Sequence, residues 1–206
     1  MLSYSVVFTI NKGLEADDFY DPNEKYIVNV QCAVTAEDSS KPNEEIEIGS
    51  MSFGIVQVRR AIKNRERLFD VFDAESGDYE YVYETLFDID KRGEFKEDIQ
   101  QQFEIKSGNI FILNASHMPS EHHEAELAAI SSFLDAFSNE AGLMILMEKR
   151  TRGKSLPQIA RWRKLGFEII SKDGLMEGYV MYGLSVKKRK RVFTETVAVL
   201  SDDNND

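Results

Sequence analysis

Two short apolar runs, Asn109-Ile-Phe-Ile-Leu-Asn-Ala-Ser116 and Gly142-Leu-Met-Ile-Leu-Met147, flank the most regular part of the chain. The segment between them repeats apolar residues at helical spacing: Leu127, Ile130, Phe133, Leu134 and Phe137. Short apolar runs on either side of a helical pattern are typical of a strand–helix–strand unit. The sequence therefore predicts a strand over 109–117, a helix over 120–138 with Ser120 as its N-cap, and a parallel strand over 142–147.

The first half of the chain predicts antiparallel strands followed by helices. Tyr4–Ile10 is a short β-branched run, and Tyr26–Val34 and Glu44–Arg59 are longer β-rich runs. The polar sequence Ser39-Ser-Lys-Pro-Asn43 lies between the longer runs, so we expect them to form an antiparallel hairpin. Apolar residues then return at helical spacing over 64–103. The expected class is mixed α/β, with a single central mixed sheet and flanking helices.

The last third adds a basic loop, a helix and further strands. Pro157 suits the first turn of a helix, and Gly166 suits its end. Strands are expected over 167–170, 178–186 and 191–200. Residues 201–206 form an acidic tail, expected to be disordered. We expect residues 1–104 to complete the fold around residues 105–200.

Composition and charge restrict the class of protein. The chain has 206 residues, of which 42% are apolar and 30% are charged, as is usual for a soluble domain. No apolar run reaches the roughly 18 residues that a membrane helix needs, and Met1–Ile10 lacks the features of a secretory signal. The single cysteine, Cys32, suits a reducing cytoplasm. The net charge of −11 disfavours a general nucleic-acid binder.

The phrase Trp162-Arg-Lys-Leu-Gly-Phe167 follows the order strand, helix, strand, helix. In this order and phrase the chain resembles the C-terminal half of the GNAT acetyltransferase superfamily, in which a helix ends in a Tyr-x-Lys-Leu-Gly-Phe-like sequence. The resemblance covers roughly residues 105–186. It implies a GNAT-like fold, acetyl-CoA as cofactor, and transfer of an acetyl or other acyl group to an amine.

The resemblance also implies where the cofactor would bind. In the family, a Gln/Arg-x-x-Gly-x-Gly/Ala loop lets the main chain approach the diphosphate. Aligned on Pro119, this chain has His122 at the Arg/Gln position, and Ala125 and Leu127 at the glycine positions. The implied cofactor-binding positions are Ser116, His117, Met118, His122, His123, Ala125 and Glu126.

This chain departs from the family pattern in further respects. The family usually has its first helices between the first two strands, whereas the helical patterns here fall at 64–103. Glu121, Glu124 and Glu126 crowd the turn, and a carboxylate about 6 Å from a phosphate costs about 3 kcal/mol at an effective dielectric constant of 20. Trp162 stands where the family often places a phenolic general acid, so the sequence assigns no catalytic residue. The alternative function is a non-catalytic GNAT-fold module that binds a protein, nucleic acid or other anionic partner through Lys149–Lys164 and Lys187–Arg191.

The three histidines, His117, His122 and His123, lie within seven residues and raise the question of a metal site. On a helix, His122 and Glu126 would share one face at i, i+4, and both are ligands that zinc accepts. The spacing fixes no third ligand, and the acids also suit a solvated helix start whose positive end they complement. We therefore expect no metal.

Overall fold

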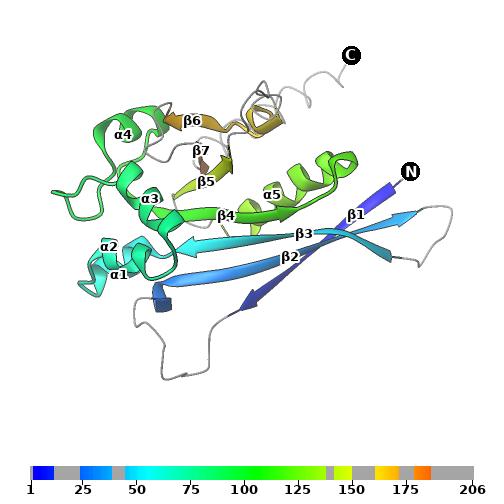
Figure 1. Ribbon diagram of the computed structural model, residues 1–206, viewed down its shortest axis with the longest axis horizontal. Helices are drawn as coiled ribbons and strands as arrows, with labels where there is room; N and C mark the ends of the chain where they lie inside the picture. Colours follow the sequence, from blue (N-terminus) through cyan, green and yellow to red (C-terminus); the bar gives the residue numbers. More distant parts are fainter. Residues whose placement is uncertain are drawn as a thin grey trace, which may run out of the picture.

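In the part of the chain that the structure describes, seven strands form one mixed sheet in the order β1-β2-β3-β4-β5-β7-β6 (Figure 1). The computed structural model describes residues 2–11, 24–38, 45–137, 142–149, 161–171 and 179–186. The strands are β1 (Leu2–Asn11), β2 (Ile27–Asp38), β3 (Glu45–Val56), β4 (Asn109–His117), β5 (Gly142–Lys149), β6 (Glu168–Ser171) and β7 (Tyr179–Ser185). The helices are α1 (Val58–Lys63), α2 (Leu68–Asp73), α3 (Gly77–Leu86), α4 (Glu97–Phe103) and α5 (His123–Phe137), with 3₁₀ turns η1 (Glu24–Tyr26) and η2 (Ser120–His122).

The strand directions confirm the expected mixed α/β class. Strands β1 to β4 pair antiparallel in succession, which confirms the hairpin between β2 and β3. Strand β5 then lies parallel to β4, and α5 lies between them in sequence, as the apolar pattern predicts. Strand β7 pairs antiparallel with both β5 and β6.

The centre of the sheet is buried on both faces. On β4, Ile110 and Ile112 belong to the apolar core beneath α1 to α4, whereas Phe111 and Leu113 belong to the core beneath α5. This alternation follows from the two-residue period of a strand. Figure 1 shows α5 along β4 and α1 to α3 gathered at the other end of the sheet. A strand that contacts helices on both faces needs a continuous apolar run, and β4 has one.

Phe133 of α5 is the centre of an aromatic cluster on the α5 face of the sheet. Its ring stacks on Phe53 of β3, with centroids 4.0 Å apart, and meets Phe111 of β4 edge to face at 6.2 Å. All three side chains are buried. Cys32 of β2 belongs to the same core, and burial raises the pKa of its thiol to about 11.

Some element boundaries differ from those expected. Strand β3 ends at Val56, and α1 begins at Val58, because Val58 and Ala61 bury their side chains at helical spacing. The helix expected from Ser120 begins as the 3₁₀ turn η2, and Ser120 bonds Glu121 rather than capping a backbone N–H. The start of the helix expected from Pro157, the strand expected over 191–200 and the tail 201–206 lie outside the described residues. Within the described part of the chain, no helix is long and apolar enough to cross a bilayer.

Gly142, the first residue of β5, lies too close to β4 to carry a side chain. A Cβ added there would lie 2.5 Å from Cε2 of Phe111 and 2.7 Å from the carbonyl oxygen of Asn109. We therefore expect Gly142→Ala to lower the free energy of unfolding by about 1–3 kcal/mol, measured by urea denaturation. In the control Gly77→Ala, the added Cβ would meet nothing within 4 Å, and we expect unchanged or higher stability. Equal destabilisation by both variants would contradict the close approach.

Candidate functional site

The parallel strands β4 and β5 separate toward their carboxyl ends. Their pairing ends at Leu113 and Leu146, although β4 continues to His117 and β5 to Lys149. The register between β3 and β4 shifts at the same place, so that Asn114 is an extra residue on β4. Because a β-bulge bends its strand and increases the local twist, Asn114 accounts for the direction in which β4 leaves β5.

Tyr79 of α3 holds the bulge from the opposite face of the sheet. Its hydroxyl donates to Oδ1 of Asn114 at 2.9 Å, and the side chain is almost completely buried. Burial raises the pKa of Tyr79, so the hydroxyl stays protonated and remains a donor. The hydrogen bond from Tyr79 of α3 therefore helps to stabilise the bulge at which β4 leaves β5.

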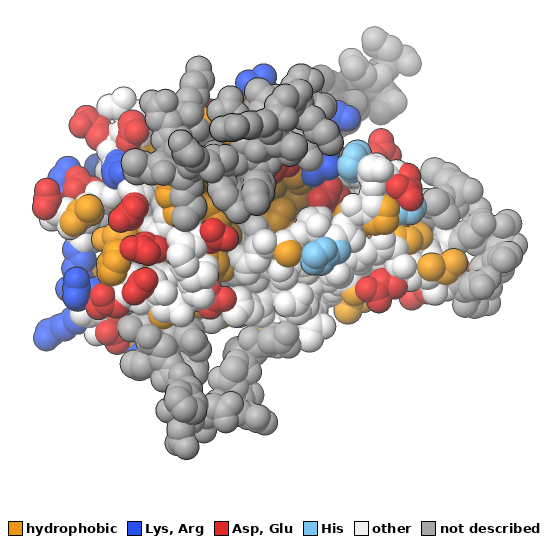
Figure 2. Space-filling model, in the orientation of Figure 1, with side chains coloured by type: hydrophobic (Ala, Val, Ile, Leu, Met, Phe, Trp, Pro, Cys, Tyr) orange, Lys and Arg blue, Asp and Glu red, His pale blue; other side chains and the backbone are white. Residues whose placement is uncertain are grey.

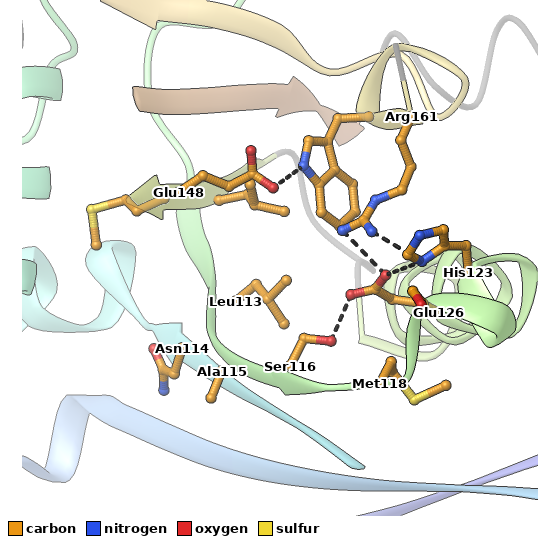
Figure 3. A pocket seen from close by; sticks show the side chains of 13 residues that line it. Leu113, Asn114, Ala115, Ser116, Met118, His123, Glu126, Glu148 and Arg161 are labelled. Carbon is orange, nitrogen blue, oxygen red and sulfur yellow. Dashed lines mark hydrogen bonds and ion pairs between the residues drawn. The ribbon is translucent and has the colours of Figure 1, made fainter. Parts of the chain in front are cut away.

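A pocket of about 460 Å³ opens between the diverging strand ends (Figure 3). This volume is within the range of roughly 300–1,000 Å³ that is usual for small-molecule sites. Leu113 and Leu146 form part of its lining, and polar side chains from β4, β5, α5 and residues 161–162 supply much of the remainder. The carboxyl ends of neighbouring parallel strands are where ligands of α/β proteins commonly bind.

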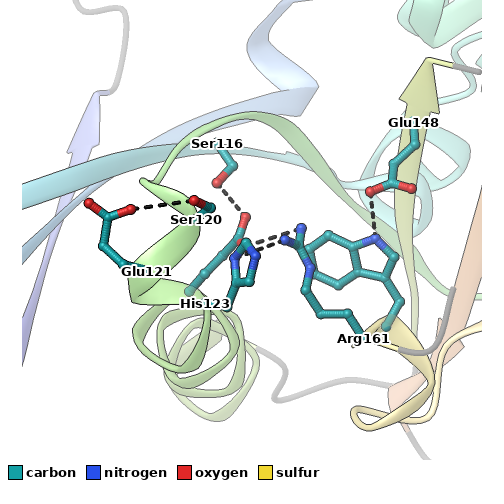
Figure 4. A network of polar contacts seen from close by, with 8 residues as sticks. Ser116, Ser120, Glu121, His123, Glu148 and Arg161 are labelled. Atoms are coloured by element: carbon teal, nitrogen blue, oxygen red, sulfur yellow. Dashed lines mark hydrogen bonds and ion pairs between the residues drawn. The ribbon is translucent and has the colours of Figure 1, made fainter. Parts of the chain in front are cut away.

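A buried carboxylate, Glu126 of α5, lies at the centre of the polar side of the pocket. Ser116 of β4 donates to its Oε1 at 2.6 Å, and the guanidinium of Arg161 lies 3.2 Å from its Oε2. Arg161 also lies 3.1 Å from Nδ1 of His123, on the first turn of α5 (Figure 4). The Glu126 side chain is only 4% exposed, so these partners replace the water that its carboxylate oxygens would otherwise contact.

One nitrogen of the Arg161 guanidinium makes no hydrogen bond to the residues that the structure describes. The guanidinium stacks over the ring of Trp162, 4.1 Å from the centroid, and its terminal nitrogens contact Glu126 and His123. Its Nε is buried and has no hydrogen-bond partner among the residues that the structure describes. An unsatisfied buried N–H is unfavourable by about 1–3 kcal/mol, which an anionic ligand in the pocket could relieve.

A second carboxylate, Glu148 of β5, lines the pocket away from Glu126 (Figure 3). Trp162 donates from Nε1 to Glu148 at 2.7 Å, and Tyr182 of β7 also hydrogen-bonds this carboxylate. Burial raises the pKa of Glu148, while Trp162 and Arg161 oppose the rise. Burial and the neighbouring carboxylate raise the pKa of Tyr182 to about 12, so Tyr182 is the donor in this pair.

The surface near the start of α5 is acidic. Glu121 and Glu124 are exposed there, and the His123 side chain is 46% exposed. Figure 2 shows histidine and acidic side chains on the side of the molecule where β4 passes into α5. A ligand with negative charge therefore approaches α5 against these carboxylates, although salt and water weaken the repulsion.

Four of the seven cofactor-binding positions implied by the resemblance line the pocket: Ser116, Met118, His123 and Glu126. The other three do not. His117 is exposed opposite Ser50 of β3, the His122 ring meets Tyr4 of β1 with centroids 6.3 Å apart, and Ala125 is buried in the core under α5.

Sequence reasoning missed Arg161 and Glu148 as pocket residues. The sequence predicts Arg161 on a basic surface with Arg163 and Lys164, whereas only Arg163 and Lys164 are exposed. The apolar spacing of Trp162 and the helix end at Gly166 could have placed Arg161 beside a buried face. Of the basic segments proposed for a partner, 150–160 and 187–191 lie outside the described residues.

No group of three or more His, Cys, Asp or Glu side chains is placed to hold a metal ion in the described ranges. His122 belongs to the turn η2 and faces Tyr4, whereas Glu126 faces Ser116 and Arg161. The i, i+4 pair suggested by the sequence therefore does not form a shared site.

A second cavity, of about 640 Å³, lies beside α2 and α3. Leu68, Phe69 and Tyr83 contribute to its apolar part. The carboxylate Glu66 at its edge already accepts from Tyr26 at 2.9 Å and from Lys25 at 3.4 Å. Because this carboxylate has a structural role, the pocket between β4 and β5 is the stronger candidate site.

Comparisons with protein-family models, with curated proteins and with solved structures found no match to this chain.

Proposed function

We propose that this chain has a GNAT-like fold and transfers an acyl group from acyl-CoA to an amine. The observation that carries the proposal is the end of the β4–β5 pairing at Leu113 and Leu146, with a pocket between the strands beyond it. A gap between parallel strands leaves backbone polar groups free to hydrogen-bond the amides of a thioester arm. The phrase Trp162–Phe167 and the crossover helix α5 support the same proposal.

The pocket fits an acyl-CoA in part. The unpaired Nε–H of Arg161 and the start of the 15-residue helix α5 are suitable partners for phosphate oxygens. The side chains of Ser116 and Met118 line the gap where the thioester arm would lie. Glu126 disfavours phosphate binding, because its carboxylate already forms an ion pair with Arg161. We therefore expect acyl-CoA to bind, but weakly.

Glu148 is the residue that we assign to proton transfer. A thioester supplies an activated carbonyl carbon, and the attacking amine must lose a proton to become nucleophilic. As the C–N bond forms, the C–S bond of the thioester breaks, and CoA leaves as a thiolate that takes up the proton accepted by the base. Burial raises the affinity of Glu148 for a proton, and Trp162 and Tyr182 fix the orientation of its carboxylate. These hydrogen bonds hold the base in place and so favour the attack of a bound amine.

The alternative is a binding module without catalysis. The observation that favours it is the network of Ser116, Glu126 and Arg161 along one side of the pocket. These side chains bind one another where a cofactor would need them. In this alternative, the pocket is a remnant and the charged surfaces bind a partner. Under either function we expect a cytoplasmic protein, because the single thiol of Cys32 is buried and unpaired.

Binding of acetyl-CoA, measured by titration calorimetry and thermal unfolding, tests the proposal. Ligand at about a hundredfold excess over Kd stabilises the folded state by about 2.7 kcal/mol. Ala115→Phe places a ring in the pocket and should remove the stabilisation, whereas Ala128→Phe, on the exposed side of α5, should not. If millimolar acetyl-CoA neither releases heat nor raises the unfolding temperature, the binding module becomes the better assignment.

A further inference from the structure

Arg161 and Glu126 form an ion pair, and the guanidinium of Arg161 keeps one N–H that could bind a further anion. The two residues are 35 positions apart in sequence, and they meet because the helix end that carries Arg161 packs beside the first turns of α5. Arg161 is 17% exposed and lines the pocket, so a ligand can reach it. Glu126 is 4% exposed and lines the same pocket.

We propose that Arg161 is the phosphate-binding residue of this pocket and that Glu126 is its internal competitor. A ligand phosphate takes the place of the Glu126 carboxylate on the guanidinium. The inference rests on the proposed function, because the phosphate is that of the acyl-CoA. It assigns phosphate recognition to a side chain that follows β5, since the turn after β4 has Ala125 and Leu127 where a glycine-rich loop would be needed.

The geometry of the guanidinium supports the exchange. Arginine presents its N–H groups as a planar fork that matches two oxygens of a phosphate. The Nε–H is covered and has no partner in the described part of the chain. A phosphate that displaces the Glu126 carboxylate from the guanidinium can bind this Nε–H together with one terminal nitrogen. The Trp162 ring beneath the guanidinium, at 4.1 Å, fixes the plane of the fork.

Glu126 does not lose every partner in the exchange. Ser116 still donates to its Oε1 at 2.6 Å, and His123 Nδ1 lies 3.9 Å from its Oε2. A carboxylate with these neighbours can remain buried, but it stays close to the incoming phosphate and repels it. Glu126 therefore lowers the affinity for phosphate-bearing ligands and leaves the affinity for an uncharged thioester arm unchanged.

Calorimetric titration of the full chain with two ligands tests this assignment. Acetyl-CoA carries the phosphates, and S-acetylpantetheine carries the same thioester arm without them. We expect Glu126→Gln to tighten acetyl-CoA binding about tenfold and Arg161→Gln to weaken it about tenfold, the scale of one charge-assisted contact. Neither substitution should change the affinity for S-acetylpantetheine by more than about twofold, because that ligand forms no ionic contact with either residue.

Two exposed residues provide matched controls. Glu124→Gln and Arg163→Gln change the same charges on the same elements, and both side chains face solvent. Each should alter acetyl-CoA binding less than about twofold, because solvent screens them. Should Arg161→Gln fail to fold with Glu126 unpaired, the double variant Glu126→Gln/Arg161→Gln removes both charges, and it should bind acetyl-CoA about tenfold more weakly than Glu126→Gln alone.

The outcomes separate this inference from the proposed function. Acetyl-CoA binding that is equal in the wild type, Glu126→Gln and the double variant overturns the role of Arg161 and leaves acyl-CoA binding intact. Equal effects of the substitutions on both ligands also overturn it, because they indicate a general disturbance of the pocket. Failure of both ligands to bind to any variant overturns the proposed function and, with it, this inference.

Discussion

Glu148→Gln is expected to lower the rate of acyl transfer by about a hundredfold to ten-thousandfold, the range usual for loss of a general base. Glutamine has nearly the same shape as glutamate. In the wild type, Nε1 of Trp162 donates to Oε1 of Glu148 at 2.7 Å, and the carbonyl oxygen of the glutamine can accept the same hydrogen bond. It cannot take a proton from the amine. The loss should therefore fall on kcat, with the affinity for acetyl-CoA unchanged in calorimetry.

The pH dependence gives an independent check on Glu148. Burial raises its pKa above the ordinary value, and the base works only when deprotonated, so activity should appear as the pH rises through the raised pKa. The residual activity of Glu148→Gln should lack this step. A raised carboxyl pKa also means that the folded state holds the proton more tightly than the unfolded state. Glu148 thus lowers stability as the pH rises from its ordinary pKa to the raised one.

The same linkage supplies the control for folding. Because ionised Glu148 opposes folding at neutral pH, Glu148→Gln should be as stable as the wild type or more stable in urea denaturation. Glu94→Gln, at an exposed carboxylate remote from the pocket, should change neither rate nor stability measurably. An unaltered kcat in a well-folded Glu148→Gln protein would remove Glu148 from the mechanism.

Phe133→Ala is expected to lower the free energy of unfolding by about 3–5 kcal/mol, the usual range for a fully buried phenylalanine. The ring is 0% exposed, stacks on Phe53 with centroids 4.0 Å apart, and meets Phe111 edge to face. Its removal leaves a cavity between α5 and the sheet that neighbouring rings can fill only by leaving their own contacts. Since a typical domain is stable by about 5–15 kcal/mol, this variant should unfold at a much lower urea concentration.

Ile89→Ala is the matched control for the Phe133 variant. Its side chain is also apolar but is 76% exposed, so truncation should change stability by less than about 0.5 kcal/mol. A loss of less than about 1 kcal/mol in Phe133→Ala would mean that α5 does not pack on the sheet as described.

The central unit of the fold was predictable because its pattern is local. A continuous apolar run on β4 indicates burial on both faces, and the spacing of Leu127, Ile130 and Phe133 indicates the helix that covers one of them. The bulge at Asn114 was not predictable. It is a mismatch in register between β4 and β3, and the donor that holds it, Tyr79, is 35 residues away.

The candidate site was predictable only where the chain itself marks it. Ser116, Met118, His123 and Glu126 lie at the strand–helix junction that the resemblance identifies, and all four line the pocket. Arg161 resembles its exposed neighbours Arg163 and Lys164 in sequence. Only contact with Glu126 and Trp162 turns it inward, and such pairings across long sequence separation have no local signal.

The burial of Cys32 has a practical consequence for measuring acyl transfer. Its thiol is 1% exposed and has a pKa of about 11, so almost none of it is thiolate at the pH of a colorimetric disulfide reagent. In an assay of the proposed acyl transfer, colour that develops with folded protein would therefore report free CoA. The same reagent added in denaturant titrates one sulfhydryl per chain, which calibrates the enzyme concentration in the same cuvette.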